Sequence, residues 1–154
     1  MMFILSAKCE SYLELVHPDL VRVVRSTARN WPDDGTIFRI TCGARTLDEQ
    51  KRLVAVGASR TLKSRHIIAP NGYSHAVDFC VVVDGLIKWD WPLYEIGAEH
   101  FKKSATAENV PIEWGGDWTS FKDGPHIQLP WAEYPGTTAL VADASAGVGE
   151  AANA

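Results

Sequence analysis

The stretch AVDFCVVVDGLIKW, residues 76–89, decides the fold of this chain. It begins with a run rich in β-branched side chains, from Ala76 to Val83, which is typical of a strand. The dipeptide Asp84-Gly85 follows and is a strong hairpin signal. Because Leu86 to Trp89 then returns as a second strand, the sequence predicts an antiparallel hairpin at the centre of the domain.

Shorter strands are expected on both sides of this hairpin. Residues 36–41 alternate polar and apolar side chains, as a half-buried strand does. Two further short strands are predicted at residues 111–114 and 125–129, and the glycine turn Gly115-Gly116 follows the first of them. These strands and the hairpin would form one small antiparallel sheet.

Helical patterns flank these strands. Residues 10–29 carry apolar side chains at roughly helical spacing, and Pro18 favours a second helix starting there. Thr46 and Glu49 fit a capping box that opens a helix. A further helix is predicted to begin at Pro92. Helices that flank a small antiparallel sheet make an α+β domain.

The length and composition indicate one globular domain. The chain has 154 residues, is 46% hydrophobic and 22% charged, and carries a formal net charge of −4. Proteins that bind nucleic acid by neutralising phosphates normally have a basic excess, so this class becomes improbable. We expect the domain to span residues 1–136, followed by a flexible Ala/Gly-rich tail over residues 137–154.

The N-terminus and the cysteines indicate the cellular compartment in which the protein is made. The apolar run at residues 1–7 is too short for a membrane span and lacks the basic start of a signal peptide, so a soluble cytoplasmic product without membrane insertion is expected. Cys9, Cys42 and Cys80 form no CxxC pair. They are predicted to be buried and inert, not a disulfide framework or a zinc knuckle.

Metal-capable side chains concentrate in three places: at His66, at His75 and Asp78, and at Asp123 and His126. Two imidazoles and one carboxylate suffice for a catalytic zinc ion, which keeps a fourth position open for water. Asp123 precedes His126 across a short turn, which suits a carboxylate that accepts a proton beside the metal without ligating it. The alternative is that these are structural histidines and a turn-forming aspartate. The HExxH signature of many zinc hydrolases is absent.

Longer motifs carry a resemblance to a known family. Ser64-Arg65-His66, followed by His75-Ala76-Val77-Asp78-Phe79, is similar to the pattern Ser-x-His-x-x-Gly-x-Ala-x-Asp. The segments 113–118 and 123–128 (EWGGDW and DGPHIQ) resemble the C-terminal half of the same family. It comprises the zinc peptidases that include D-alanyl-D-alanine carboxypeptidases and phage L-alanyl-D-glutamate endolysins. The endolysin branch is the closer match, and the similarity covers roughly residues 5–135.

The resemblance implies a role for each matching residue. His66, Asp78 and His126 would bind zinc, and Asp123 would be the catalytic base. Arg45 matches an arginine that faces the substrate carbonyl, where a guanidinium can stabilise an oxyanion. The implied fold is that of the D-Ala-D-Ala metallopeptidases, a hedgehog-like arrangement with the zinc site on the sheet.

One spacing departs from the family pattern. The histidine and aspartate of the family are seven positions apart, whereas Asp78 follows His66 by twelve, and the extra residues fall around Ile68–Gly72. We expect this insertion to bulge out as a loop while both ligands keep their positions. The alternative is that His75 replaces His66 as the ligand.

Four other residues are candidates for supporting roles. Ser64 is expected to position His66 through a hydrogen bond, and Gln50 to support the site. Glu113 is either a structural or hydrogen-bonding neighbour of the site or a rival catalytic acid. Trp114 either lines a peptide groove or belongs to the core.

The resemblance implies a zinc-dependent peptidoglycan endopeptidase that cuts the bond between L-alanine and D-glutamate in the stem peptide. A D-alanyl-D-alanine carboxypeptidase is the alternative within the family, and a non-catalytic zinc-containing wall-binding module is the alternative outside it. A monomer is expected. By analogy with phage enzymes, it would wait in the host cytoplasm for a membrane-permeabilising holin.

Overall fold

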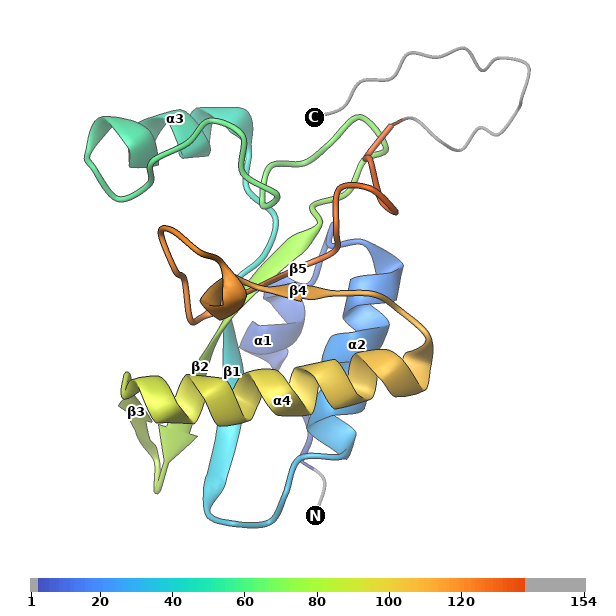
Figure 1. Ribbon diagram of the computed structural model, residues 1–154, viewed down its shortest axis with the longest axis vertical. Helices are drawn as coiled ribbons and strands as arrows, with labels where there is room; N and C mark the ends of the chain where they lie inside the picture. The colour runs from blue at the N-terminus through green and yellow to red at the C-terminus, as the bar shows by residue number, and fades with distance from the viewer. Residues whose placement is uncertain (1–2, 138–154) are drawn as a thin grey trace.

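A computed structural model describes residues 3–137 (Figure 1). The predicted tail, Thr137 apart, lies outside these residues, so the proposed boundary at residue 136 stays a prediction. The elements follow in this order: α1 (Ala7–Tyr12), α2 (Pro18–Arg29), β1 (Thr36–Cys42), α3 (Leu47–Ala55), β2 (Ala76–Val83), β3 (Leu86–Lys88), α4 (Trp91–Glu108), β4 (Glu113–Trp114), the 3₁₀ helix η1 (Gly115–Asp117) and β5 (His126–Gln128).

The sheet is antiparallel and β2 lies at its centre. Within the described residues it has five strands in the order β1-β2-β5-β4, and β3 pairs with β2 outside this path. The first three residues of β2 pair with β5 and its last three with β3, while β1 runs along the opposite edge. The predicted α+β class with a small antiparallel sheet is confirmed.

Local sequence signals form as expected. Asp84 and Gly85 both have positive φ angles, 50° and 83°, which a two-residue hairpin turn of this kind requires. The capping box is complete, because the Glu49 amide donates to the Thr46 hydroxyl and the Thr46 amide donates to the Glu49 carboxylate. Pro18 stands at the first turn of α2.

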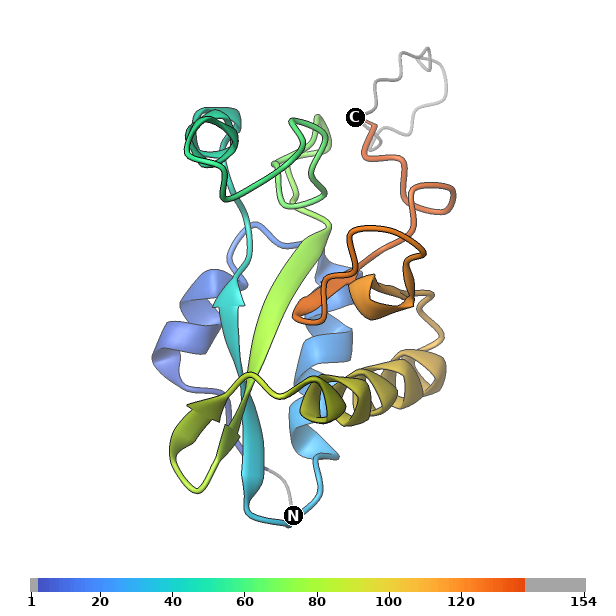
Figure 2. The same cartoon turned by 60° about the vertical axis from the view of Figure 1, so that its left-hand side comes forward.

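The hydrophobic core lies between the sheet and helices α2 and α4, on one side of the sheet in Figure 2. Phe79 of β2 is fully buried against Phe101 of α4, with ring centroids 4.9 Å apart, and Phe38 of β1 packs on the same ring. Helix α1 lies against β1, where the Ile40 amide donates to Cys9 Sγ at 3.4 Å. The core therefore packs against one face of β2.

One end of the sheet is covered by a helix and a long irregular segment. α3 and the long segment from residue 56 to 75 lie beyond the C-terminal end of β1 and the start of β2 (Figure 2). Among the described residues, none of the helices combines the length and the apolar character that crossing a bilayer requires. Side chains from these irregular segments and from the adjacent strand ends form the site described next.

Candidate metal and active site

Asp78, the third residue of β2, stands between two neighbouring strands that each bring a metal-capable side chain. It pairs with Cys42 of β1 on one edge and with His126 of β5 on the other. A register shift between Ile40 and Cys42 adds one residue to β1, so Cys42 and not Thr41 faces Asp78. Such a bulge redirects a side chain to the other face of the sheet.

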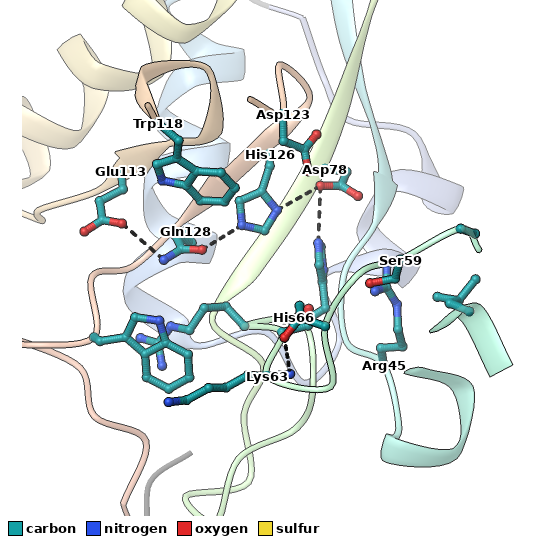
Figure 3. A pocket seen from close by; sticks show the side chains of 16 residues that line it. Arg45, Ser59, Lys63, His66, Asp78, Glu113, Trp118, Asp123, His126 and Gln128 are labelled. Carbon is teal, nitrogen blue, oxygen red and sulfur yellow. Dashed lines mark hydrogen bonds and ion pairs between the residues drawn. The ribbon is translucent and has the colours of Figure 1, made fainter. Parts of the chain in front are cut away.

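His66 comes to Asp78 from the irregular segment. The Ser64 hydroxyl accepts a hydrogen bond from the His66 amide at 3.1 Å, and the Arg45 amide donates to the His66 carbonyl at 2.8 Å. These bonds hold the loop against the end of β1, and His66 Nε2 lies 3.2 Å from Asp78 Oδ1 (Figure 3). Ser64 therefore contacts the His66 backbone, and its role in positioning His66 stays a prediction.

His126 approaches the same oxygen from β5. Its Nδ1 lies 3.3 Å from Asp78 Oδ1, and its Nε2 lies 2.8 Å from Gln128 Oε1. The Gln128 amide nitrogen donates to Glu113 at 3.2 Å, which fixes the glutamine oxygen as the acceptor for His126. Glu113 thus acts through Gln128 on His126.

The hydrogen bonds of both imidazoles favour a cation between them and Asp78. His66 Nδ1 lies 2.8 Å from the Gly43 carbonyl, which can only accept, so this nitrogen carries a hydrogen. By the same reasoning His126 Nε2 carries a hydrogen toward Gln128. In a neutral ring the other nitrogen presents a lone pair, and both such nitrogens face one carboxylate oxygen. Either protons or a metal ion must occupy this position, so the donor set fits a metal.

Two residue groups around Asp78 are able to hold a metal ion. One comprises Cys42, His66 and Asp78, the other Asp78, Asp123 and His126, and the donor atoms within each group lie within 4.8 Å of one another. Asp78 is common to both groups. The insertion between His66 and Asp78 therefore does not keep their side chains apart.

The two aspartates of the cluster differ in the direction of their pKa shifts. Burial alone would raise the pKa of Asp78, but hydrogen bonds from His126 and His66 hold it well below its usual range. Burial would likewise lower the pKa of His66, but its hydrogen bonds with Asp78 and Cys42 raise it to about 10. The pKa of Asp123 is raised, first by burial and then by the negative charge of Asp78. Asp123 is thus the carboxylate with the greater affinity for a proton.

Arg45 is held beside this cluster by two side chains. Its NH1 donates to Gln50 Oε1 at 2.6 Å, and its NH2 donates to Cys42 Sγ at 3.1 Å. Gln50 is fully buried and also donates to the Ser59 hydroxyl and the Thr61 carbonyl. Gln50 therefore joins Arg45 to the loop after α3, which agrees with the supporting role expected for it.

A cleft with a volume of about 550 Å³ opens over the cluster. Figure 3 shows its lining, in which His66, Asp78, Asp123 and His126 lie together. Trp118 also lines it and lies 5.2 Å from the His126 ring, measured between ring centroids. The arrangement combines metal-capable side chains, a carboxylate with raised pKa and a guanidinium in one opening, which suits hydrolysis of a polar bond.

Two candidate residues lie elsewhere. His75 is buried in contact distance of His17 (5.4 Å between centroids) and is absent from the cleft lining, so the geometry does not support its replacing His66. Trp114 is a core residue whose indole donates to the Gly124 carbonyl at 2.7 Å. Its alternative place in a peptide groove is wrong, and Trp118 and Trp131 line the cleft instead.

Two members of the cluster, Cys42 and Gln128, were not predicted from the sequence. Cys42 was expected to be inert and buried like Cys9 and Cys80, but it is only half-buried and contacts Arg45 and His66. Its position depends on the bulge in β1, for which no sequence signal was found. Gln128 could have been found, because it follows His126 by two residues and a strand returns to the same face with that period.

Comparisons with known proteins agree with one another. A family model described as phage L-alanyl-D-glutamate peptidase matches residues 1–129. The L-alanyl-D-glutamate peptidase of Listeria phage A118 is 35% identical over 91 residues, which are 58% of this chain and 29% of that protein. The peptidoglycan L-alanyl-D-glutamate endopeptidase CwlK of Bacillus subtilis is 37% identical over 103 residues, 58% of this chain and 59% of that protein. The chain thus matches less than two thirds of either relative's length.

A solved structure is similar over nearly the whole fold. The crystal structure of the Serratia marcescens L-Ala D-Glu endopeptidase ChiX superposes with a TM-score of 0.73 at 36% sequence identity. The match covers 88% of this chain and 94% of ChiX.

Proposed function

This chain belongs to the phage L-alanyl-D-glutamate peptidase family, and from that membership we propose that it is a zinc-dependent endopeptidase of bacterial peptidoglycan. The bond it would hydrolyse joins L-alanine to D-glutamate in the stem peptide. His66, Asp78 and His126 are the proposed zinc ligands, Asp123 the proposed base, and Arg45 the proposed oxyanion donor.

One observation carries the proposal, namely the convergence of two imidazole nitrogens on one oxygen of Asp78. The separations of 3.2 and 3.3 Å from each imidazole to Asp78 support zinc, because donor atoms about 2.0–2.1 Å from a tetrahedral zinc ion lie about 3.3 Å apart. His66 and His126 themselves belong to different candidate groups, so binding one ion would bring these two rings closer together. Outer hydrogen bonds from ligating histidines to carbonyl or carboxamide oxygens are also usual at zinc sites. Gly43 and Gln128 supply them here.

Bound zinc would acidify a water molecule and polarise the substrate carbonyl. Asp123, whose pKa is raised, is suited to take the proton of that water and deliver it to the departing amine of D-glutamate. Arg45, oriented by Gln50 and Cys42, has further N–H groups to donate to the oxygen of the scissile carbonyl as negative charge develops there.

We further infer that the protein acts as a monomer and reaches the wall from the host cytoplasm with the help of a holin. Both points rest on analogy with phage enzymes. It is tested by expressing the chain in bacteria with and without a membrane-permeabilising protein, with lysis expected only when both are present.

The activity is tested on purified peptidoglycan. We expect the protein to release new amino groups without new reducing sugars, and mass spectrometry to find stems that begin at D-glutamate. A chelator should abolish the release and added zinc should restore it. The matched control is Asp123→Asn, which should bind zinc but have a much lower turnover.

Two outcomes would contradict the proposal. Release of terminal D-alanine alone would identify a carboxypeptidase. Wild-type turnover no greater than that of Asp123→Asn, with zinc and wall binding intact, would identify a binding module.

A further inference from the structure

Three cationic side chains line the cleft, and they differ in what they contact. The Arg65 guanidinium is buried and donates to the backbone carbonyls of Leu129, Pro130 and Tyr134. Arg45 is held by Gln50 and Cys42. The Lys63 ammonium makes neither a hydrogen bond nor an ion pair among residues 3–137, whereas both guanidinium groups make several hydrogen bonds.

Lys63 is nonetheless directed along the cleft. Its Nζ lies 5.9 Å from the centroid of the Trp131 ring, and both residues line the opening. An aromatic ring at this distance attracts the ammonium and limits where it can lie. Figure 3 shows Lys63 and Arg45 on opposite sides of His66, so these two cations can contact different parts of one substrate.

The cleft also contains negatively charged side chains. Asp78, Asp123 and Glu113 bring three carboxylates to the lining. A glutamate residue joined to its neighbours through its amino group and one carboxyl group keeps its second carboxyl group ionised. An anion of the substrate next to the scissile bond pairs most readily with a cation whose donors are not already used within the protein, as those of Lys63 are not.

We propose that Lys63 binds the unlinked carboxylate of the D-glutamate residue and so determines the specificity of the enzyme on that side of the bond. The inference rests on the proposed function and deepens it. A hydrogen bond between an ammonium and a carboxylate is among the stronger polar contacts and discriminates against a neutral carboxamide. The enzyme is therefore expected to prefer stems with D-glutamate to otherwise identical stems in which that carboxylate is amidated.

The test pairs two substrates with four proteins. Synthetic stems with the carboxylate or with the amide are incubated with the wild type, Lys63→Met, Lys63→Arg and Lys103→Met. The last variant is the control, because it removes the same charge from an exposed position of α4. Values of kcat/KM are compared. The wild type and the control should prefer the carboxylate by roughly tenfold. Lys63→Met should cleave both stems alike, and Lys63→Arg should keep most of the preference.

Each other outcome overturns the inference. If Lys63→Met cleaves at L-alanine and keeps the wild-type preference, the carboxylate is recognised elsewhere, although the proposed activity stands. If the wild type itself cleaves the carboxylate and amide stems equally well, no residue recognises the carboxylate. If the wild type cleaves neither stem between L-alanine and D-glutamate, the proposed function fails and the inference fails with it.

Discussion

His66 and His75 flank the same inserted loop and are both buried, but they lie in opposite electrostatic surroundings. His66 faces the Asp78 carboxylate, and its hydrogen bonds raise its pKa to about 10 despite burial. Burial, helped by the positive charge of Arg65, lowers the pKa of His75 to about 4. The Nδ1 atom of His75 has no hydrogen-bond partner in the described part of the chain. Burial alone therefore does not make a histidine functional, whereas an adjacent carboxylate favours a positive charge or a metal.

Replacing each imidazole by a carboxamide tests the difference between the two histidines most directly. His66→Gln should lose bound zinc and reduce turnover by more than the 10- to 100-fold typical of losing an outer partner of a metal ligand, because it removes a proposed ligand itself. His75→Gln should retain both zinc and turnover. Metal analysis and kcat/KM on peptidoglycan measure the two effects, with circular dichroism as the check on folding. Zinc loss in His75→Gln together with zinc retention in His66→Gln would reverse the assignment.

A change beside the metal site should separate chemistry from metal binding. Asp123→Asn removes the proposed base and keeps a side chain of similar size, so turnover should fall by about 10²- to 10⁴-fold. Zinc content should stay at the wild-type level, because Asp123 is not a proposed ligand. Equal loss of zinc and of turnover would show instead that Asp123 holds the metal.

His75 should affect how the free energy of unfolding depends on pH. Unfolded His75 binds a proton below pH ~6.5, whereas folded His75 does so only near pH 4. The unfolded state therefore binds more protons within this window, and stability is lost as the pH falls through it, by about 3 kcal/mol at most. Urea unfolding at several pH values measures the effect. His75→Gln should lose less stability than the wild type between pH 7 and pH 4.5, and parallel curves would contradict the expectation.

The smallest expected effect concerns the hydrogen bonds behind His126. Gln128→Ala removes the acceptor that orients the ring, and an outer partner of this kind is typically worth about 10- to 100-fold in metal affinity or activity. The double variant Glu113→Gln with Gln128→Glu exchanges the two groups and retains a hydrogen bond at each step. We expect zinc affinity, measured by competition with a chelating dye, to fall in the first variant and to recover in the second. No recovery would mean that the charge on Glu113 matters and not the bond to His126.

Much of the site was predictable because the motifs keep its residues in recognisable order. The proximity of His66, Asp78, Asp123 and His126 was expected from the family resemblance, and the structure brings them to one cleft. The place of Trp114 was left open between groove and core, since a tryptophan suits either and only the packing around it decides. Trp131 and Lys63 belong to no motif, and their place in the cleft follows from how the chain turns after β5 and before His66.

The sequence alone determined the local structure of this protein, including the capping box at Thr46 and Glu49 and the hairpin turn at Asp84-Gly85. These signals act between residues at most a few positions apart, so they are present before the chain folds. The pairing of Cys42 with Asp78 and the hydrogen bonds from Glu113 through Gln128 to His126 arise only when the strands come together. These contacts depend on strand register, and because side chains alternate along a strand, a shift of one residue turns each of them to the other face of the sheet.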